Sequence, residues 1–211
     1  MTMKLRLHHN SAKNVVPQKV GIGICNQGSV RSSTMLSLLG IIFETRNTLF
    51  HVIERQGCYI EENRTWIVRE AQRANCSHLL FLDSDIVCPP DTLTRMLASK
   101  KLIVGANYNE RRLPLSSTVK FSDGNGQLIA MPVERIPHTL FSCAAVATGC
   151  LLTKMSVFEH VPSPWFKCEY NDDGTLRTGE DVFFCAHAKE AGFEVWCDPT
   201  LVVRHVGDYA F

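Results

Sequence analysis

The chain has 211 residues, of which 45% are hydrophobic and 20% charged, and its formal net charge is +1 at pH 7. These values are typical of one globular domain with a sizeable core, and the near-neutral charge gives no reason to expect nucleic acid or an anionic membrane as a partner. No apolar run approaches the roughly 18–20 residues that span a bilayer, and the N-terminus lacks the apolar segment of a secretory signal.

The first half of the chain alternates predicted strands with predicted helices. Strands are expected at 19–25, 49–55, 78–83 and 102–107, and helices at 30–46, 61–75 and from the proline pair at 89–90 to about residue 100. Proline suits the first turn of a helix, which supports the last of these. Such alternation predicts a mostly parallel sheet with helices on both faces.

The second half of the chain is predicted to be more irregular. Residues 110–153 contain short extended pieces broken by Gly, Pro and Asp-Gly, followed by a helix at 179–191 and strands near 193–197 and 201–206. We therefore predict a single α/β domain at 18–211, preceded by an N-terminal extension at 1–17.

Nine cysteines are scattered singly along the chain, without a C-x-x-C pair. This argues against a zinc ribbon or a redox motif. Several lie in apolar stretches, where cysteine behaves as a small core residue. Reduced thiols are usual in the cytoplasm, so we predict a cytoplasmic protein.

The segment "LLFLDSDIVCPP" at 79–90 runs from an apolar strand into two aspartates, Asp83 and Asp85. On an extended backbone both side chains point the same way. Ligands of open α/β sheets bind beyond the carboxyl ends of strands, and paired carboxylates there suit Mg²⁺ or Mn²⁺. The alternative is a turn or helix-capping acid before Pro89.

A second acidic pair, Glu180 and Asp181, lies at the start of the last predicted helix. Thr178 and Asp181 have the spacing of a capping box, with Asp in place of the usual Glu. However, Asp181 also shares a helical face with Phe184 and Cys185, so it is expected to point inward, where a carboxylate can act as a general base. Spacing alone leaves both interpretations open.

Two basic side chains are expected on buried faces. His205 alternates with Leu201 and Val203, so it is either a core histidine or a metal ligand. Arg64 lies in line with Ile67 along the predicted helix at 61–75. A buried guanidinium needs a carboxylate such as Asp83 or a bound phosphate, and both interpretations stay open.

Other motifs are absent or ambiguous. The glycines of "GIGICNQG" do not match G-x-G-x-x-G, and the chain has no P-loop and no G-x-S-x-G elbow. The pair Trp165–Phe166 is either core or a stacking platform for a flat ligand. Phosphohydrolases of the haloacid dehalogenase type also use D-x-D at a strand end, but usually on the first strand and followed by Gly-Thr, unlike Ile86–Val87 here.

The strand ending in D-x-D resembles glycosyltransferases of the GT-A fold, close to the large inverting family 2. The resemblance continues in "ATGCLLTKMSVFE" at 147–159, "PWF" at 164–166 and "GEDVFFCAHAKEAGFEVWCDPTLVVRHVG" at 179–207. It covers about 19–207 and rests on the ordered set of D-x-D, E-D and a late H-x-G. It implies a Rossmann-like nucleotide-diphospho-sugar transferase domain, with nucleotide-sugar binding at 18–107 and acceptor binding at 108–211.

The resemblance also implies roles for individual residues. Asp85, His205 and Asp83 would hold Mn²⁺ or Mg²⁺, with Asp85 binding it directly and Asp83 nearer the ribose or sugar hydroxyls of the donor. Asp181 would be the catalytic base, and Glu180 would position the base or the acceptor. The donor-binding residues would be Cys25, Asn26, Gln27, Arg64, Asp83, Ser84 and Gly149, and the acceptor would meet Trp165 and Phe166.

The function implied is metal-dependent transfer of a sugar from a UDP- or GDP-sugar to a hydroxyl of a glycan or another acceptor, with inversion. Some retaining mannosyltransferases share the pattern, so a retaining enzyme is one alternative, and a catalytically silent nucleotide-sugar-binding module is another. Four residues follow Gly207, so a C-terminal lid over the donor is expected to be missing or to come from another subunit, and homo-oligomerisation stays open.

Overall fold

The computed structural model describes residues 18–111, 113–124 and 127–207, so the expected N-terminal extension at 1–17 lies outside the described residues. The helices are α1 (Ser32–Glu44), α2 (Ile60–Arg73), α3 (Thr92–Ala98), α4 (Met155–His160) and α5 (Glu180–Glu190), with a 3-10 turn at Val133–Arg135. The strands are β1 (Gln18–Asn26), β2 (Thr48–Gln56), β3 (His78–Leu82), β4 (Ile86–Val87), β5 (Ile103–Ala106), β6 (Lys120–Ser122), β7 (Leu128–Ala130), β8 (Phe141–Cys143), β9 (Cys150–Lys154), β10 (Glu169–Tyr170), β11 (Leu176–Thr178), β12 (Val195–Asp198) and β13 (Arg204–His205).

A seven-stranded sheet forms the centre, in the order β2-β1-β3-β9-β5-β12-β8. β1 pairs in parallel with β2 and β3, and β12 pairs in parallel with β5. β9 is antiparallel to both β3 and β5, and β8 is antiparallel to β12. Five strands therefore run in one direction, which confirms the mostly parallel sheet.

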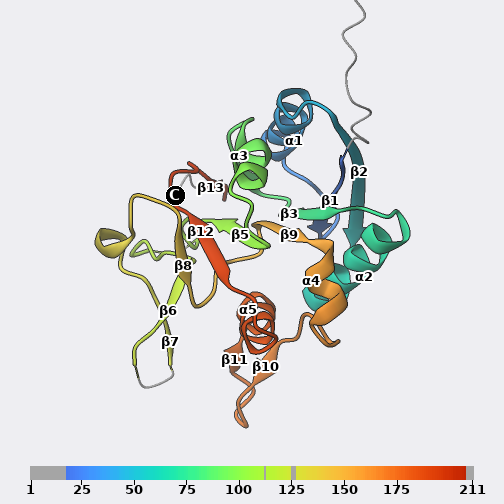
Figure 1. The fold of residues 1–211 in the computed structure, drawn as a ribbon. Coiled ribbons are helices and arrows are strands. Elements are labelled where there is room, and N and C mark those ends of the chain that lie inside the picture. Colours follow the sequence, from blue (N-terminus) through green and yellow to red (C-terminus); the bar gives the residue numbers. More distant parts are fainter. Residues whose placement is uncertain (1–17, 112, 125–126, 208–211) are drawn as a thin grey trace, which may run out of the picture.

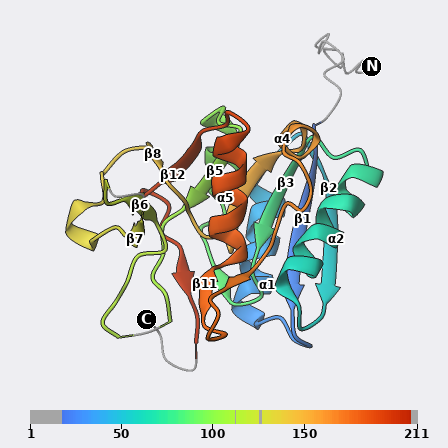
Figure 2. The ribbon, with the colours of Figure 1, turned by 90° about the horizontal axis from the view of Figure 1, so that it is seen from below.

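Helices cover both faces of this sheet (Figures 1 and 2). On one face, α1 and α3 pack against a core cluster that includes Ile22, Leu80 and Val104. On the other, α2, α4 and α5 pack against a cluster that includes Leu79 and Phe81. Successive residues of β3 thus point into opposite clusters, as the alternation of a strand buried on both faces requires.

The elements of the first half agree with the sequence predictions to within a few residues at each end. The second half differs more. β9 falls among the short extended pieces expected within residues 110–153, and its antiparallel place between β3 and β5 was not predicted. The short helix α4 was not predicted either, since six residues carry little periodic signal.

Three two-stranded sheets stand outside the central one. β6 and β7 form one hairpin, and β10 and β11 form another. The third pairs β13 with β4, so that His205 lies opposite Ile86, directly after the D-x-D segment. The end of the described chain is thereby brought back to the end of β3.

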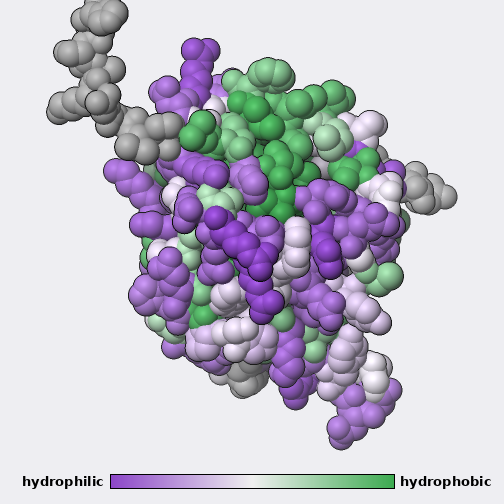
Figure 3. Space-filling view, turned by 90° about the vertical axis from the view of Figure 1, so that its right-hand side faces the viewer, coloured by the Kyte–Doolittle hydropathy of each residue, from purple (hydrophilic) through white to green (hydrophobic). Residues whose placement is uncertain are grey.

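Apolar side chains also gather on the surface over α1 and the edge strand β2 (Figure 3). The most exposed are Leu36 and Phe43 on α1, at 69% and 80%, and Leu49 on β2, at 54%. These three residues line neither of the two cavities described below. This apolar surface is therefore separate from the candidate site.

The cysteines are all free thiols. Seven are buried, Cys168 is half-buried and Cys58 is exposed, which confirms that most of them are core residues. Within the part of the chain that the structure describes, no helix is both long and apolar enough to cross a bilayer.

Candidate functional site

The D-x-D turn begins where β3 ends and is held by hydrogen bonds from three elements. The backbone N–H of Asp83 donates to the Gly149 carbonyl, just before β9, at 2.9 Å. The Ser84 carbonyl accepts a 2.9 Å bond from the N–H at the N-cap of α1, and the Asp85 carbonyl accepts a 2.8 Å bond from Val206 after β13. The two carboxylates are therefore presented by a rigid turn.

Arg64 of α2 is 3% exposed and joins the two acidic pairs. Its Nη2 donates to Asp83 Oδ2 at 3.3 Å and its Nη1 lies 3.2 Å from Asp83 Oδ1, while its Nε donates to Glu180 Oε1 at 3.1 Å. Burial alone would lower the pKa of Arg64, but the two carboxylates outweigh it and raise that pKa above its usual value. Of the two kinds of partner considered for Arg64, the carboxylate is present, and Arg64 has two such partners, Asp83 and Glu180.

Asp85 has an arginine and a histidine as neighbours. Its Oδ1 lies 3.3 Å from His205 Nε2, and its Oδ2 lies 2.9 Å from Arg111 Nη1. Burial would raise the pKa of Asp85, but the hydrogen bond and charge of His205 and the charge of Arg111 hold it below its usual value. Asp85 is therefore an ionised carboxylate in contact with a histidine.

Gly149 lies against Asp83 and Tyr108. A Cβ on Gly149 would collide with the Tyr108 hydroxyl and come within 2.8 Å of Asp83 Oδ2. Tyr108 also packs edge-on against His205, with ring centroids 5.6 Å apart. The close approach of Tyr108 and Asp83 therefore requires a glycine at this position.

Asp181 lies in the first turn of α5. The capping-box interpretation is wrong, because the N-cap residue is Gly179, no side chain caps the helix, and Thr178 ends β11 instead. Asp181 Oδ1 accepts a 2.7 Å bond from the Val182 N–H. Burial, and then the negative charge of Glu180, raise the pKa of Asp181 to about 6.

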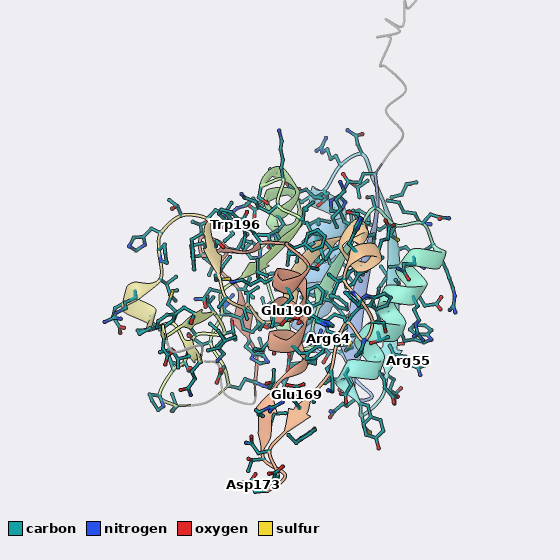
Figure 4. The ribbon with its side chains drawn as sticks, turned by 60° about the horizontal axis from the view of Figure 1, so that its bottom comes forward. Arg55, Arg64, Glu169, Asp173, Glu190 and Trp196 are labelled. Atoms are coloured by element: carbon teal, nitrogen blue, oxygen red, sulfur yellow. The ribbon has the colours of Figure 1, made fainter. Side chains whose placement is uncertain are left out.

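Two cavities meet at the D-x-D turn, and Asp83, Arg111 and His205 line both. The smaller, of about 420 Å³, lies at the ends of β1 and β2. The larger, of about 1150 Å³, runs along α5 between the β6–β7 and β10–β11 hairpins. Figure 4 shows Glu169 at the base of the second hairpin, beside α5, and Asp173 at its tip.

The expected donor-binding residues divide between these cavities. The smaller cavity is lined by Cys25, Asn26, Gln27 and Ser84. The larger cavity is lined by Arg64 and Gly149, and both cavities are lined by Asp83. The Asn26 amide is already occupied, since it accepts a 2.8 Å bond from the Gly28 N–H and donates to Glu54.

Trp165 and Phe166 belong to the core. They are 8% and 3% exposed, they pack against Phe158, and the Trp165 indole N–H donates to the Val161 carbonyl at 2.9 Å. Neither lines either cavity. The expected acceptor role of this pair is therefore wrong, because a ligand cannot stack on rings that the core encloses.

Asp85 and His205 have the donor set and the spacing for a divalent ion. A separation of 3.3 Å between Oδ1 and Nε2 is close to the roughly 3 Å between neighbouring ligands of an octahedral ion with bonds of about 2.1 Å. Among the described residues, no three or more His, Cys, Asp or Glu side chains are grouped to hold a metal. The residues present therefore fit an ion that takes its other ligands from water or from a bound molecule.

Two residues that line the larger cavity, Tyr108 and Arg111, were not predicted from the sequence. They follow β5, and the rule that ligands bind beyond the carboxyl ends of strands points to them once this strand is predicted. Phe183 and His187 of α5 were not predicted either, because the rotation of α5 about its axis is set by tertiary packing.

No protein-family model and no curated protein matches this sequence. Among solved structures, A197 from STIV has a TM-score of 0.63 at 17% identity, over 90% of this chain and 86% of that one. TarS 1–349 from S. aureus, in complex with UDP-GlcNAc, has a TM-score of 0.50 at 12% identity, over 87% of this chain and 59% of that one. At these identities the likenesses show the fold alone: the chain shares the α/β fold of these two structures.

The ion pairs of Arg64 lead to a stability prediction. We expect Arg64→Met to lower the free energy of unfolding by about 3 kcal/mol, because it leaves two largely buried carboxylates without their cation. Arg69→Met, on the exposed side of the same helix, is the matched control, and urea denaturation measures both. Adding Asp83→Asn and Glu180→Gln to Arg64→Met should recover part of the loss. Equal stability of the two single variants would contradict the importance of these ion pairs.

The raised pKa of Asp181 leads to a pH prediction. Since this pKa rises from 3.8 to about 6 on folding, ionisation of Asp181 destabilises the folded state progressively between about pH 4 and 6, and fully above that window. Asp181→Asn removes this penalty, so its stability relative to wild type should increase by up to about 3 kcal/mol between pH 4 and pH 7.5. Thermal unfolding across this pH range measures the difference, and a pH-independent difference would contradict the prediction.

Proposed function

We propose that the protein is a metal-dependent glycosyltransferase that moves a sugar from a nucleotide-diphosphate sugar to an acceptor hydroxyl with inversion. The observation that carries this proposal is the position of the D-x-D turn between two cavities. Asp83 and His205 line both cavities, and Asp181 lines the larger one. Donor and acceptor can therefore meet at this turn from opposite sides.

The smaller cavity suits the nucleoside part of a UDP- or GDP-sugar. It is lined by the end of β1 and the turn after it, by the segment that follows β2, by the first turn of α2 and by the D-x-D segment. Its volume of about 420 Å³ lies in the range of small-ligand pockets. The diphosphate would then lie where the cavities join, beside Arg111, whose charge favours it.

Asp85 and His205 would hold Mn²⁺ or Mg²⁺ at this junction. A divalent ion bound there supplies a Lewis acid that neutralises the charge building on the leaving nucleoside diphosphate. Because no group of three or more His, Cys, Asp or Glu side chains could hold the ion within the described part of the chain, donor oxygens and water would complete the coordination. Metal affinity should therefore depend on the nucleotide.

Asp181 is the proposed general base. A carboxylate with a pKa of about 6 remains largely ionised at neutral pH and is more basic than an ordinary aspartate, which suits it to take a proton from an attacking hydroxyl. Arg64 bonds Glu180, which directly precedes Asp181 in the chain. Glu180 and Arg64 are therefore proposed to position the base relative to the D-x-D turn. Asp181 lines the larger cavity. The acceptor would therefore occupy this cavity, on the side of the D-x-D turn away from the nucleoside.

Turnover measurements test this proposal. Wild-type protein should release UDP or GDP from at least one UDP- or GDP-hexose only when Mn²⁺ or Mg²⁺ is present. Asp181→Asn should keep metal-dependent donor binding and lose turnover by about 10²–10⁴, the usual value of general-base help. Asp172→Asn, in the exposed turn of the β10–β11 hairpin, is the control. Turnover of Asp181→Asn within a few-fold of wild type, or a product with retained anomeric configuration by NMR, would exclude this role.

A further inference from the structure

One side of α5 continues to line the larger cavity beyond the proposed base. Four residues of α5 that line the cavity recur at three- and four-residue spacing and therefore share one face of the helix. They are Glu180, Phe183, His187 and Glu190. Ten residues of helix correspond to about 15 Å along its axis. The cavity therefore extends farther along α5 than one pyranose ring can reach.

Phe183 and His187 form an aromatic pair in this extension. Their ring centroids are 5.0 Å apart at an interplanar angle of 50°, and both side chains are half-buried. His187 Nδ1 is buried and has no hydrogen-bond partner among the described residues. A buried polar atom without a partner is costly, which makes this nitrogen a candidate for bonding a ligand.

The charges around this pair compensate one another. Arg177 and Lys167 lie 2.9 and 3.3 Å from the Glu169 carboxylate, and Lys120 lies 3.1 Å from Glu110. Glu190 adds a third carboxylate to the cavity lining, so three cations face three carboxylates. Because neither sign prevails, this part of the cavity offers no surplus cation for a polyanion. A neutral ligand with both an apolar face and hydroxyl groups matches it better, since an aromatic ring and a polar nitrogen lie side by side.

We propose that Phe183 and His187 form an acceptor subsite for a neutral oligosaccharide, binding a sugar ring next to the one that carries the attacking hydroxyl. This inference rests on the proposed glycosyl transfer. The Phe183 ring packs against the C–H face of the sugar, and His187 Nδ1 forms a hydrogen bond with one of its hydroxyls. The consequence is that acceptors of two or more rings bind better than single sugars.

NMR titration tests this subsite directly. The probes are malto-, cello-, chito- and manno-oligosaccharides of one to four rings, added to protein with Mg²⁺ and UDP or GDP. For at least one series, we expect shifts in the Phe183 ring and His187 imidazole signals, with two-ring sugars binding roughly tenfold more tightly than one-ring sugars. Absence of such shifts in all four series, or equal affinity for one and two rings, would overturn the proposal.

Variants separate the subsite from general effects on the fold. Phe183→Leu and His187→Ala should each weaken two-ring binding about five- to tenfold and leave one-ring binding unchanged. Tyr170→Leu replaces an exposed aromatic residue outside the cavity and should change neither. Melting temperatures of all three variants check folding. Unchanged two-ring affinity in both cavity variants would remove these residues from the subsite.

The nucleotide titration keeps the two proposals distinguishable. Binding of UDP or GDP that depends on Mg²⁺ tests the proposed function, whereas the oligosaccharide shifts test the subsite. Nucleotide binding without length-dependent sugar binding overturns the subsite alone. Length-dependent sugar binding without any nucleotide binding supports the sugar subsite and overturns glycosyl transfer.

Discussion

The buried guanidinium of Arg64 holds the candidate site together. It bonds Asp83 at the end of β3 and Glu180 at the start of α5, two carboxylates that would otherwise repel each other and Asp181 at close range. Arg64 also explains how a core strand can end in an acidic turn, since Asp83 has Arg64 as its cation. Asp85 has Arg111 as its cation and lies 3.3 Å from His205. The negative charge of the turn is thus compensated residue by residue.

The sheet order determines which segments reach this turn. Because β9 lies antiparallel beside β3, its start delivers the Gly149 carbonyl to the Asp83 N–H. Because β13 pairs with β4, the last described strand delivers His205 to Asp85. The D-x-D turn is consequently fixed from both sides before any ligand binds, which is the preorganisation that the proposed transfer would require.

Much of this arrangement was predictable from local pattern. The helical stripe through Arg64 predicted its burial, and alternation in the last strand predicted that His205 faces inward with Leu201 and Val203. In contrast, the second partner of Arg64 could not be predicted, because Glu180 lies far along the chain and only the tertiary fold brings the start of α5 to Arg64. The capping box failed for a similar reason: Thr178 pairs with Glu169 in a hairpin that its local sequence does not reveal. Likewise, no pattern distinguished the enclosed Trp165 and Phe166 from Phe183, which lines the cavity.

The central claim is that a divalent ion binds at Asp85 and His205 together with a nucleoside diphosphate. Paramagnetic broadening by Mn²⁺ in the NMR spectrum tests it most directly, with UDP and GDP as the nucleotides. The account predicts that substoichiometric Mn²⁺ broadens the His205 imidazole signals first and the Phe183 ring signals much less, and that nucleotide strengthens the effect. Broadening that spares His205, or that spreads evenly over surface carboxylates with and without nucleotide, would contradict it.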